Sequence, residues 1–409
     1  MNALDTLKAR GFVQTSTDYE QLSAHLESGS RTFYVGFDPT GDSLHVGHIV
    51  PVMAMAWLQR FGHRPIAVLG GGTAMVGDPT GKDQSREILT PEIIAQNREC
   101  FRTQLAGFLE VSDPHAQQFA AESNDAILVD NGEWLLGLKY IDFLRDIGRH
   151  FSINRMLSAE GTKQRLERDQ GMSFIEFNYH LLQSYDFLVL KEKHDCTIQV
   201  GGDDQWFNIL GGVNLIRRAG GGKAHAMTVP LIATADGKKM GKTEAGAVWL
   251  DGKKLSPFDY YQYWVNVQDA DVDRFLKLYT FLDLEKIGEL AHLQGADIRQ
   301  AKAVLAFEAT AIAHGREAAE QARKAAEKLF SGQSTEGMPT HSVQVPILAI
   351  DALADSGLTP SKGAARRLIK MGGARFEKDK LTDVDALIHE PGVLWAGKKR
   401  AIQLVSDAS

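Results

Sequence analysis

Cysteines, long apolar runs and an excess of basic charge are all missing or scarce in this 409-residue sequence. Its two cysteines, Cys100 and Cys196, are too few for a disulfide framework and favour a reducing, cytoplasmic setting. No apolar run is long enough to span a bilayer, and residues 1–10 contain Asp5 and no continuous apolar core. We therefore expect no membrane segment and no signal peptide. The composition predicts a soluble globular chain.

The formal net charge of −7 argues against a generic nucleic-acid binder, but the charge is uneven along the chain. Residues 343–409 contain ten Lys and Arg and eight Asp and Glu, a net charge of +2, whereas residues 1–342 have a net charge of −9. The length is sufficient for two or three domains. The basic excess therefore belongs to the end of the chain.

A strand, a polar turn and a helix follow one another between residues 31 and 61. Arg31–Phe37 are mostly β-branched or aromatic and predict a strand, and Asp38–Ser43 have turn chemistry. Ile49–Phe61 are mostly apolar and predict a buried helix. His45 and His48 are therefore placed in the first turn of a helix that follows a strand.

A helix start with two histidines is a candidate phosphate site. The first turn of a helix has unpaired N–H groups and a partial positive charge, and the imidazoles of His45 and His48 add further donors. Gly47 lets a nucleotide approach the backbone closely. From this motif alone two alternatives stay open. The histidines are ordinary surface residues, or they are zinc ligands, although no second pair with ligand spacing follows.

Two common nucleotide-binding motifs are absent downstream. Arg64–Leu69 predict a second strand, so the segments strand, helix and strand begin a parallel sheet. The glycines at 70–72 fail the dinucleotide fingerprint because Met75 occupies its last glycine position. Residues 77–82 fail the P-loop pattern because they have one residue too few before the Gly-Lys pair. Dehydrogenase and P-loop kinase functions are therefore disfavoured.

Three of the four charged residues in the polar loop 77–86 have two interpretations each. Asp78 is placed to face a crevice at the carboxyl edge of the sheet, or it caps a turn. Lys82 and Arg86 are solvated surface charges, or they belong to a mobile loop beside a phosphate site.

The segment 172–190 predicts a helix with an unusual polar stripe. Tyr179, Gln183 and Asp186 fall at positions i, i+4 and i+7 and share one face. Such a stripe is normally a solvated surface. The rest of this helix is largely apolar, however, so we also consider a buried stripe whose partner is a polar ligand.

Cys196–Val200 predict another strand, which ends in two glycines and two acids. Acids after the glycines of a strand commonly hydrogen-bond a ribose, so Asp203 and Asp204 are candidate ribose contacts. A helix is expected over Gln205–Arg218.

The region Trp134–Phe151 is more apolar than one buried helix face requires. An exposed apolar surface of this kind usually marks an interface between subunits, and core packing is the alternative.

Residues 246–330 predict an α-helical domain and 331–342 a polar linker, followed by a small α+β domain over 343–409. In this last domain a helix has basic residues at i, i+4, i+5 and i+8, namely Lys362, Arg366, Arg367 and Lys370. The cluster is either a solvated face or an RNA-binding surface.

A second motif, Lys239-Met240-Gly241-Lys242-Thr243, changes the interpretation of the histidines. Together the two motifs resemble the HIGH and KMSKS signatures of class I aminoacyl-tRNA synthetases, here HVGH and KMGKT. Gly241 and Thr243 stand where the class has serines, while both lysines remain. The chain resembles bacterial-type tyrosyl-tRNA synthetases nearly end to end. The similar segments are 36–40, 45–48, 77–82, 183–186, 202–206 and 239–243, and the tail resembles an RNA-binding domain of a small-subunit ribosomal protein.

The resemblance implies a Rossmann-like parallel-sheet catalytic domain over 1–245 and a homodimer, with the helical and RNA-binding domains after it. It implies activation of tyrosine with ATP to tyrosyl-adenylate and pyrophosphate, and transfer to the terminal adenosine of tRNA(Tyr). ATP would be a substrate accompanied by Mg²⁺, without a tightly bound cofactor or a metal site of the protein itself.

The resemblance also implies roles for individual residues. The phenol hydroxyl of tyrosine is bound by Tyr34 and Asp186, and the α-ammonium by Asp78, Tyr179 and Gln183. The pocket and the carboxylate side are supported by Gln199 and Gln205. The ATP and adenylate contacts are Asp38, Gly47, Gly202, Asp204 and Lys242. The phosphates are handled by Thr40, His45, His48, Lys82, Arg86, Lys239, Lys242 and Thr243.

Two rival functions share much of this pattern. A tryptophanyl-tRNA synthetase has the same fold, but Tyr34 and Asp186 suit a phenol, and that enzyme normally lacks the RNA-binding tail. A non-enzymatic RNA scaffold of synthetase descent would be expected to have lost His45, His48 or the lysines, and none of them is missing.

Overall fold

The computed structural model describes residues 1–80, 89–120, 123–159, 162–163, 166, 172–235, 240, 242–243, 246–331, 340–397 and 400–406. The chain forms two compact units, residues 1–233 with 274–284, and residues 234–273 with 285–409. The domain boundaries at 245, 330 and 342 stay predictions. No helix within the described ranges is long and apolar enough to cross a membrane.

The first unit is built on a sheet that has six strands within the described residues, in the order β1-β6-β5-β2-β3-β4. The strands are β1 (Thr15–Ser16), β2 (Thr32–Phe37), β3 (Arg64–Leu69), β4 (Ile127–Asp130), β5 (Cys196–Gly202) and β6 (His225–Val229). The strands β2 to β6 pair in parallel, and β1 is antiparallel to β6 at the edge. The predicted parallel sheet is confirmed. Its strands are nearly continuous apolar runs because helices cover both faces.

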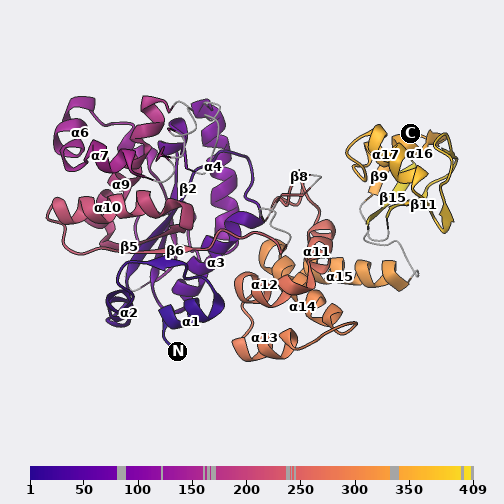
Figure 1. Ribbon diagram of the computed structural model, residues 1–409, viewed down its shortest axis with the longest axis horizontal. Helices are drawn as coiled ribbons and strands as arrows, with labels where there is room; N and C mark the ends of the chain where they lie inside the picture. Colours follow the sequence, from indigo (N-terminus) through magenta and orange to yellow (C-terminus); the bar gives the residue numbers. More distant parts are fainter. Residues whose placement is uncertain are drawn as a thin grey trace. The chain divides into compact units, whose positions relative to one another are not determined.

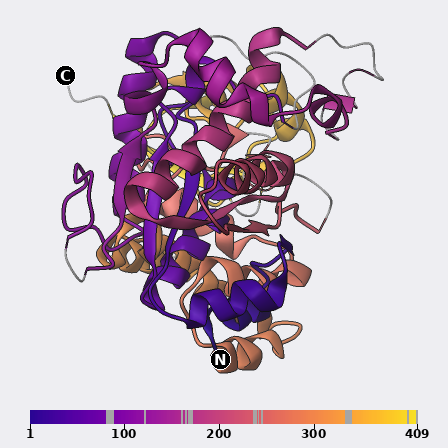
Figure 2. The same ribbon diagram turned by 90° about the vertical axis from the view of Figure 1, so that its left-hand side faces the viewer.

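The helices of this unit divide between the two faces of the sheet (Figure 1 and, turned by 90°, Figure 2). One face is covered by α3 (Val46–Arg60) and α4 (Pro91–Ala106), and the other by α9 (Phe174–His194) and α10 (Trp206–Arg218). The N-terminal helices are α1 (Ala3–Arg10) and α2 (Tyr19–Glu27). This division follows from right-handed crossovers, because the chain moves outward from β2 through β3 and β4 and then returns on the other side of β2 as β5.

The strand order therefore reverses between β2 and β5. In an open parallel sheet, a crevice forms outside the carboxyl ends of the strands at such a switch point, and ligands bind there.

The helix α9 has local signals at both ends, which explains why its pattern predicts it well. At its start, Ser173 Oγ accepts from the Glu176 N–H and Glu176 Oε2 accepts from the Ser173 N–H, a reciprocal capping box. Lys191, Lys193 and His194 lie in its last turn, where the helix dipole favours positive charge. The neighbouring helix α10 can approach α9 closely because Gly212 has no side chain. A Cβ atom there would lie only 2.9 Å from the Phe187 side chain.

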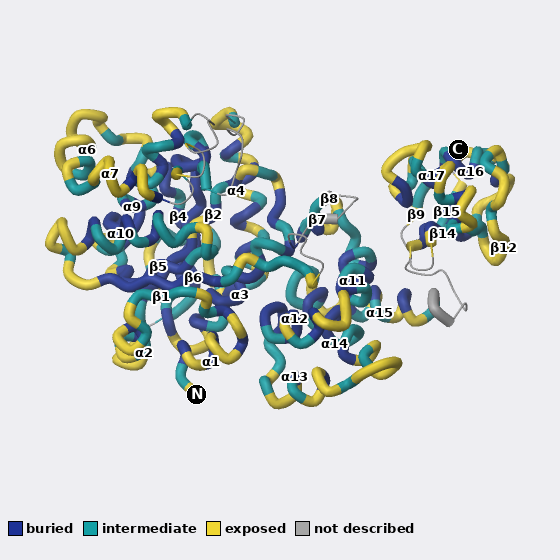
Figure 3. Tube along the Cα trace, in the orientation of Figure 1, coloured by how far each residue is buried: buried dark blue, intermediate teal, exposed yellow. Residues whose placement is uncertain are grey.

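The apolar region that follows β4 forms short helices. They are α5 (Gly132–Leu135), α6 (Tyr140–Asp146), the 3-10 turn η2 (Gly148–His150) and α7 (Ile153–Leu157). Figure 3 shows much of α6 as exposed. Tyr140 and Ile141 have 60% and 70% of their surface exposed, whereas Trp134 is buried. Further 3-10 turns in this unit are η1 (Thr73–Met75) and η3 (Asp203–Gln205).

The chain from residue 246 to 331 is mainly helical, as predicted. Its helices are α11 (Pro257–Val265), η4 (Asp269–Asp271), α12 (Val272–Tyr279), α13 (Leu284–Ala291), α14 (Ile298–His314) and α15 (Arg316–Ser331). Before them, β7 (Lys242–Thr243) pairs with β8 (Gly246–Ala247) in antiparallel fashion.

The C-terminal part has its own α+β fold and core, as predicted. A sheet of five described strands has the order β12-β11-β14-β15-β9. The strands are β9 (Thr340–Val343), β11 (Ala374–Phe376), β12 (Asp379–Lys380), β14 (Gly392–Ala396) and β15 (Arg400–Ser406), and β10 (Ile347–Leu348) pairs with β13 (Leu387–Ile388). The helices α16 (Ala349–Asp355) and α17 (Lys362–Lys370) contribute Leu353 and Ile369 to the apolar core of this part.

Candidate functional site

A cleft of about 270 Å³ lies at the switch point, between the carboxyl ends of β2 and β5. Most of the residues predicted to form a site line it, namely Tyr34, Asp38, Thr40, Gly47, His48, Asp78, Tyr179, Gln183, Asp186, Gln199, Gly202, Asp204 and Gln205. They come from two strand ends, the start of α3, the loop after η1, α9 and η3. The fold therefore brings together motifs that are far apart in the sequence.

Some predicted phosphate residues are not placed in this cleft. Lys82, Arg86 and Lys239 lie outside the described residues. Lys242 and Thr243 form β7, and only their backbone is described. Across the described ranges, no three His, Cys, Asp or Glu side chains gather into a metal site.

The two histidines cap the start of α3 with their rings. His45 Nδ1 accepts from the Gly47 N–H at 3.0 Å, and His48 Nδ1 accepts from the His45 N–H at 3.1 Å. Because both Nδ1 atoms accept, each neutral ring has its proton on Nε2. Burial lowers the pKa of His48 to about 3, with a further lowering from His45, so this ring is neutral at physiological pH. The two Nε2–H groups therefore add donors at the start of the helix, and the two rings are not arranged as a pair of metal ligands.

The buried end of the cleft holds a carboxylate with two fixed donors. Asp186 Oδ2 accepts from Asn131 Nδ2 at 3.0 Å, and its Oδ1 accepts from the indole N–H of Trp134 at 2.7 Å. Tyr34 is 1% exposed, and among the described residues its hydroxyl has no hydrogen-bond partner. A buried hydroxyl without a partner is costly, so a ligand with a polar atom at this depth would complete the pocket.

Burial controls the ionisation of both groups. It raises the pKa of the Asp186 carboxyl from 3.8 to about 7, although the donors Asn131 and Trp134 oppose the shift. Burial, followed by the charge of Asp186, raises the pKa of Tyr34 well above 10. Tyr34 is therefore a neutral hydroxyl that can donate, beside a carboxylate that can accept.

The polar stripe of α9 is buried, so its interpretation as a solvated surface is wrong. Tyr179 is 6% and Asp186 4% exposed. The Tyr179 hydroxyl donates to Asp38 Oδ2 at 2.9 Å. The Oε1 atoms of Gln183 and Gln199 are buried and have no partner among the described residues. These two amides are available to a polar ligand in the cleft.

Asp78 is held at the cleft by a turn and an amide, so both earlier interpretations of it apply. Its Oδ1 accepts from the Thr80 N–H at 2.9 Å, and its Oδ2 accepts from Gln205 Nε2 at 2.7 Å. A carboxylate fixed in this way, next to the buried Tyr179 hydroxyl, suits a cationic group such as an ammonium ion.

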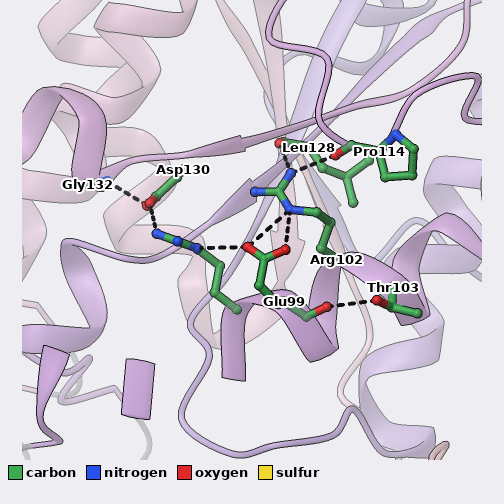
Figure 4. Close-up of polar contacts among 8 residues, drawn as sticks. Glu99, Arg102, Thr103, Pro114, Leu128, Asp130 and Gly132 are labelled. Atoms are coloured by element: carbon green, nitrogen blue, oxygen red, sulfur yellow. Dashed lines mark hydrogen bonds and ion pairs between the residues drawn. The ribbon is translucent and has the colours of Figure 1, made fainter. Parts of the chain in front are cut away.

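The turn after β4, which Figure 4 shows in part, supports the site although none of its residues was predicted to belong there. Asp130 accepts from the Gly132 N–H at 2.8 Å and pairs with Arg98 of α4. Asn131, between Asp130 and Gly132 in the sequence, accepts from the Gly72 N–H at 2.8 Å and donates to Asp186. The available signal was a strand that ends in Asp-Asn-Gly, which is the same kind of polar strand end as that after β5.

Trp134 belongs to the apolar region that was predicted as an interface or as core packing, and it is buried behind the cleft. It is 9% exposed and donates to Asp186. Thr73 was also missed: its hydroxyl donates to Asp38 Oδ1 at 2.7 Å. Gly70 is necessary here because a Cβ atom on it would lie 2.1 Å from Asp38 Oδ1.

The comparisons with known proteins agree on one family. The family model described as tRNA synthetases class I (W and Y) matches residues 27–331. A curated protein named tyrosine--tRNA ligase from Acetivibrio thermocellus is 52% identical over 393 residues, which cover 95% of this chain and 93% of that protein. Its namesake from Clostridium botulinum (strain 657) is 49% identical over 402 residues, covering 97% of this chain and 96% of that protein.

The solved structures give the same result. A C-terminally truncated mitochondrial tyrosyl-tRNA synthetase from Aspergillus nidulans superposes with a TM-score of 0.71 at 30% identity, covering 80% of this chain and 94% of that chain. A tryptophanyl-tRNA synthetase from Encephalitozoon cuniculi superposes with a TM-score of 0.55 at 13% identity, covering 81% and 91%. The second likeness shows the fold alone.

We expect Asp186 to ionise near neutral pH. Its protonated form should predominate below about pH 7 and its carboxylate above, which the infrared C=O band of the buried acid reports directly. Trp134→Phe removes a donor that favours the charged form, so it should raise the midpoint by about one pH unit. Asp186→Asn is the control that lacks the band. A midpoint near the ordinary value of 3.8, or no change in Trp134→Phe, would contradict this account.

Proposed function

The chain belongs to the family of class I tRNA synthetases for tryptophan and tyrosine, and we propose on this premise that it is a tyrosine--tRNA ligase. It activates tyrosine with ATP to tyrosyl-adenylate and pyrophosphate, and then transfers tyrosine to the terminal adenosine of tRNA(Tyr). The observation that carries the proposal is the buried pair formed by the Tyr34 hydroxyl and the Asp186 carboxylate at the end of the cleft.

A phenol hydroxyl satisfies this pair because it both donates and accepts. It donates to Asp186 and accepts from Tyr34, so both protein groups gain a partner. An indole N–H only donates, so a tryptophan side chain would leave the Tyr34 hydroxyl without an acceptor. The curated relatives at about half identity are likewise named for tyrosine.

The polar groups nearer the mouth suit the amino-acid end of tyrosine. In our proposal the α-ammonium binds at Asp78, Tyr179 and Gln183. The carboxylate lies toward Gln199 and Gln205. The ammonium position is supported by the fixed Asp78 carboxylate and by the buried Gln183 oxygen, which has no partner among the described residues and can accept from an N–H group.

ATP occupies the part of the cleft between the strand ends and the start of α3. Asp38, Gly47, Gly202 and Asp204 are the proposed contacts of the adenosine part, the last two at the ribose. ATP enters as its Mg²⁺ complex. The metal belongs to this substrate, and two or three protein carboxylates are not required to cage it.

The reaction requires positioning and donors rather than a covalent nucleophile. The tyrosine carboxylate attacks the α-phosphorus, and negative charge builds on the departing pyrophosphate. His45 and His48 lie at the start of α3, where N–H groups stabilise such charge, and Thr40 lines the cleft in the loop before it. Lys82, Arg86, Lys239, Lys242 and Thr243 are proposed to complete the phosphate site.

We also propose a homodimer in the cytoplasm, where tRNA and ATP are found. Its contact is an apolar surface composed of Leu136, Tyr140, Ile141, Leu144 and Ile153, each of which is at least 36% exposed. Large apolar side chains gathered on one surface are typical of a subunit interface.

The C-terminal part, which begins with β9 at Thr340, is the proposed tRNA-binding module. The basic residues of α17 are exposed, while Ala365 and Ile369 on its other side are buried. Lys362 pairs with Asp351 at 2.9 Å, so Arg366, Arg367 and Lys370 are expected to contribute more to phosphate binding.

Tyrosine-dependent exchange of pyrophosphate into ATP tests the function. We expect exchange with tyrosine and little with tryptophan or phenylalanine. Tyr34→Phe should lower kcat/KM for tyrosine by up to about tenfold and bring phenylalanine closer, because one neutral hydrogen bond is lost. Asp186→Asn should lower it by about 10- to 100-fold, because the lost bond is charge-assisted. No exchange with tyrosine, or an unchanged phenylalanine-to-tyrosine ratio in both variants, refutes the assignment.

Light scattering tests the dimer. The unmodified chain should have twice the mass of one chain, and Ile141→Glu should release monomers because it places an unpaired charge in an apolar contact. Ile141 is preferable to Phe143, which packs edge-on against Tyr185 at 5.6 Å within its own subunit. The matched control is Ile93→Glu, an exposed isoleucine of α4 outside the apolar surface. A monomeric unmodified chain would overturn this proposal.

A chain that ends at Ser331 tests the RNA-binding module without cutting β9. It should still exchange pyrophosphate with tyrosine, but it should aminoacylate tRNA(Tyr) poorly, because the phosphate contacts of α17 are lost. Equal aminoacylation by the short and full chains would show that the module has another role.

A further inference from the structure

We propose that His180 and Asn208 are positioning residues that fix the orientation of the Gln205 side-chain amide, and through it the amino-acid end of the substrate. The inference deepens the proposed function and rests on it. His180 follows Tyr179 on α9, and Asn208 lies in the first turn of α10. Neither residue belongs to the motifs that the sequence indicated.

Three hydrogen bonds connect these residues in a row. His180 Nδ1 lies 3.1 Å from Asn208 Oδ1, and Asn208 Nδ2 donates to Gln205 Oε1 at 3.1 Å. Gln205 Nε2 donates to Asp78 Oδ2 at 2.7 Å. The row therefore ends at the carboxylate that we assign to the α-ammonium of tyrosine.

The direction of the row is determined by its last member. A carboxylate only accepts, so Gln205 must turn its NH₂ group toward Asp78 and its oxygen toward Asn208. Asn208 must then donate to Gln205, and its own oxygen faces His180. His180 is therefore the donor, with its proton on Nδ1. This tautomer is the opposite of the one found for His45 and His48, whose Nδ1 atoms accept.

The direction matters because of what Gln205 presents to the cleft. An NH₂ group has two hydrogens, and Asp78 takes one. The other is available to the substrate carboxylate, which needs donors. If the amide were reversed, its oxygen would face both Asp78 and the substrate carboxylate. The partial negative charge of that oxygen would then repel the substrate carboxylate. Asp78 favours this orientation of the amide, and Asn208, whose own oxygen His180 holds, adds a second hydrogen bond that only this orientation can make.

The His180 ring is itself held by its surroundings. It stacks on Phe207 with ring centroids 4.4 Å apart and meets Phe151 edge-on at 5.4 Å. A Cβ atom on Gly211 would lie 2.3 Å from His180 Cε1, so only glycine leaves room for the ring. Burial lowers the pKa of His180 to about 4, and the ring is therefore neutral under working conditions. The surroundings therefore hold the His180 ring in one position and in one neutral tautomer.

Pyrophosphate exchange with four variants tests the proposal. His180→Phe keeps an aromatic ring and removes the donor, and Asn208→Leu keeps the volume and removes the amide. Each should raise KM for tyrosine by about 3- to 10-fold, the loss expected for one buried hydrogen bond. KM for ATP and kcat should stay within about twofold of those of the unmodified chain, because the phosphate site is untouched. The double variant should be no worse than Asn208→Leu alone, since both act through one row.

The matched control is His194→Phe, a change of the same kind on the same helix. His194 meets Phe119 edge-on at 6.1 Å, so its aromatic contact resembles that of His180. It should leave every constant unchanged. Equal losses for tyrosine and ATP in His180→Phe, or additive losses in the double variant, would indicate general damage to the fold and overturn the proposal.

A second measurement does not depend on the function. In protein labelled with ¹⁵N-histidine, the signals lost in His180→Phe identify this ring, and their shifts show which nitrogen has the proton. Protonation at Nδ1 is expected, and protonation at Nε2 would refute the direction of the row. The two failures remain distinct: an unmodified chain without exchange refutes the ligase proposal, whereas an active chain with unaffected variants refutes only this inference.

Discussion

A carboxylate buried at the end of an apolar pocket is the constraint on which the rest of this site depends. Asp186 is 4% exposed, and a charge there is tolerable only with donors on its oxygens. Asn131 and Trp134 provide them. Their positions in turn depend on the turn after β4, which the pair of Arg98 and Asp130 attaches to α4. Substrate pocket and scaffold are therefore one hydrogen-bonded structure, and a change in the turn would alter the pocket.

The order of the strands decides where that structure forms. Because β2 is paired with β3 on one side and with β5 on the other, the order of the parallel strands reverses at β2. Residues 34–38 and 199–202 meet there, although they are far apart in the sequence. The helices that complete the cleft come from opposite faces, α3 from one and α9 from the other. A site of this kind exists only when both halves of the sheet are assembled.

Donor direction is the second organising feature, and it again originates at carboxylates. Asp38 accepts from Tyr179 and Thr73, and Asp78 accepts from Gln205. Each acid thereby sets the rotation of a neighbour that could otherwise present either a donor or an acceptor. A cleft prepared in this way does not have to reorganise when charge moves from a carboxylate to pyrophosphate, which is the condition for effective electrostatic stabilisation.

Local patterns were sufficient for much of the fold. The strand, turn and helix at 31–61, the helix α9 and the basic helix α17 depend on side-chain period and on capping residues next to them, and the structure confirms all three. Motif residues such as Tyr34, Asp78 and Gln205 could also be selected, because strand ends and a polar stripe mark them. Asn131 and Trp134 could not be selected from the sequence. Their partner, Asp186, lies 55 and 52 positions away, and periodicity does not separate core from surface.

The sequence by itself therefore determined which elements form and which chemical groups are available to a substrate. Only the tertiary structure decided that the stripe of α9 is buried, that Trp134 faces a carboxylate while Ile141 faces solvent, and that His180 meets Asn208. The physical reason is that burial and hydrogen-bond direction are not properties of a segment. They arise between segments, when a group that loses water must find its partner on a distant part of the chain.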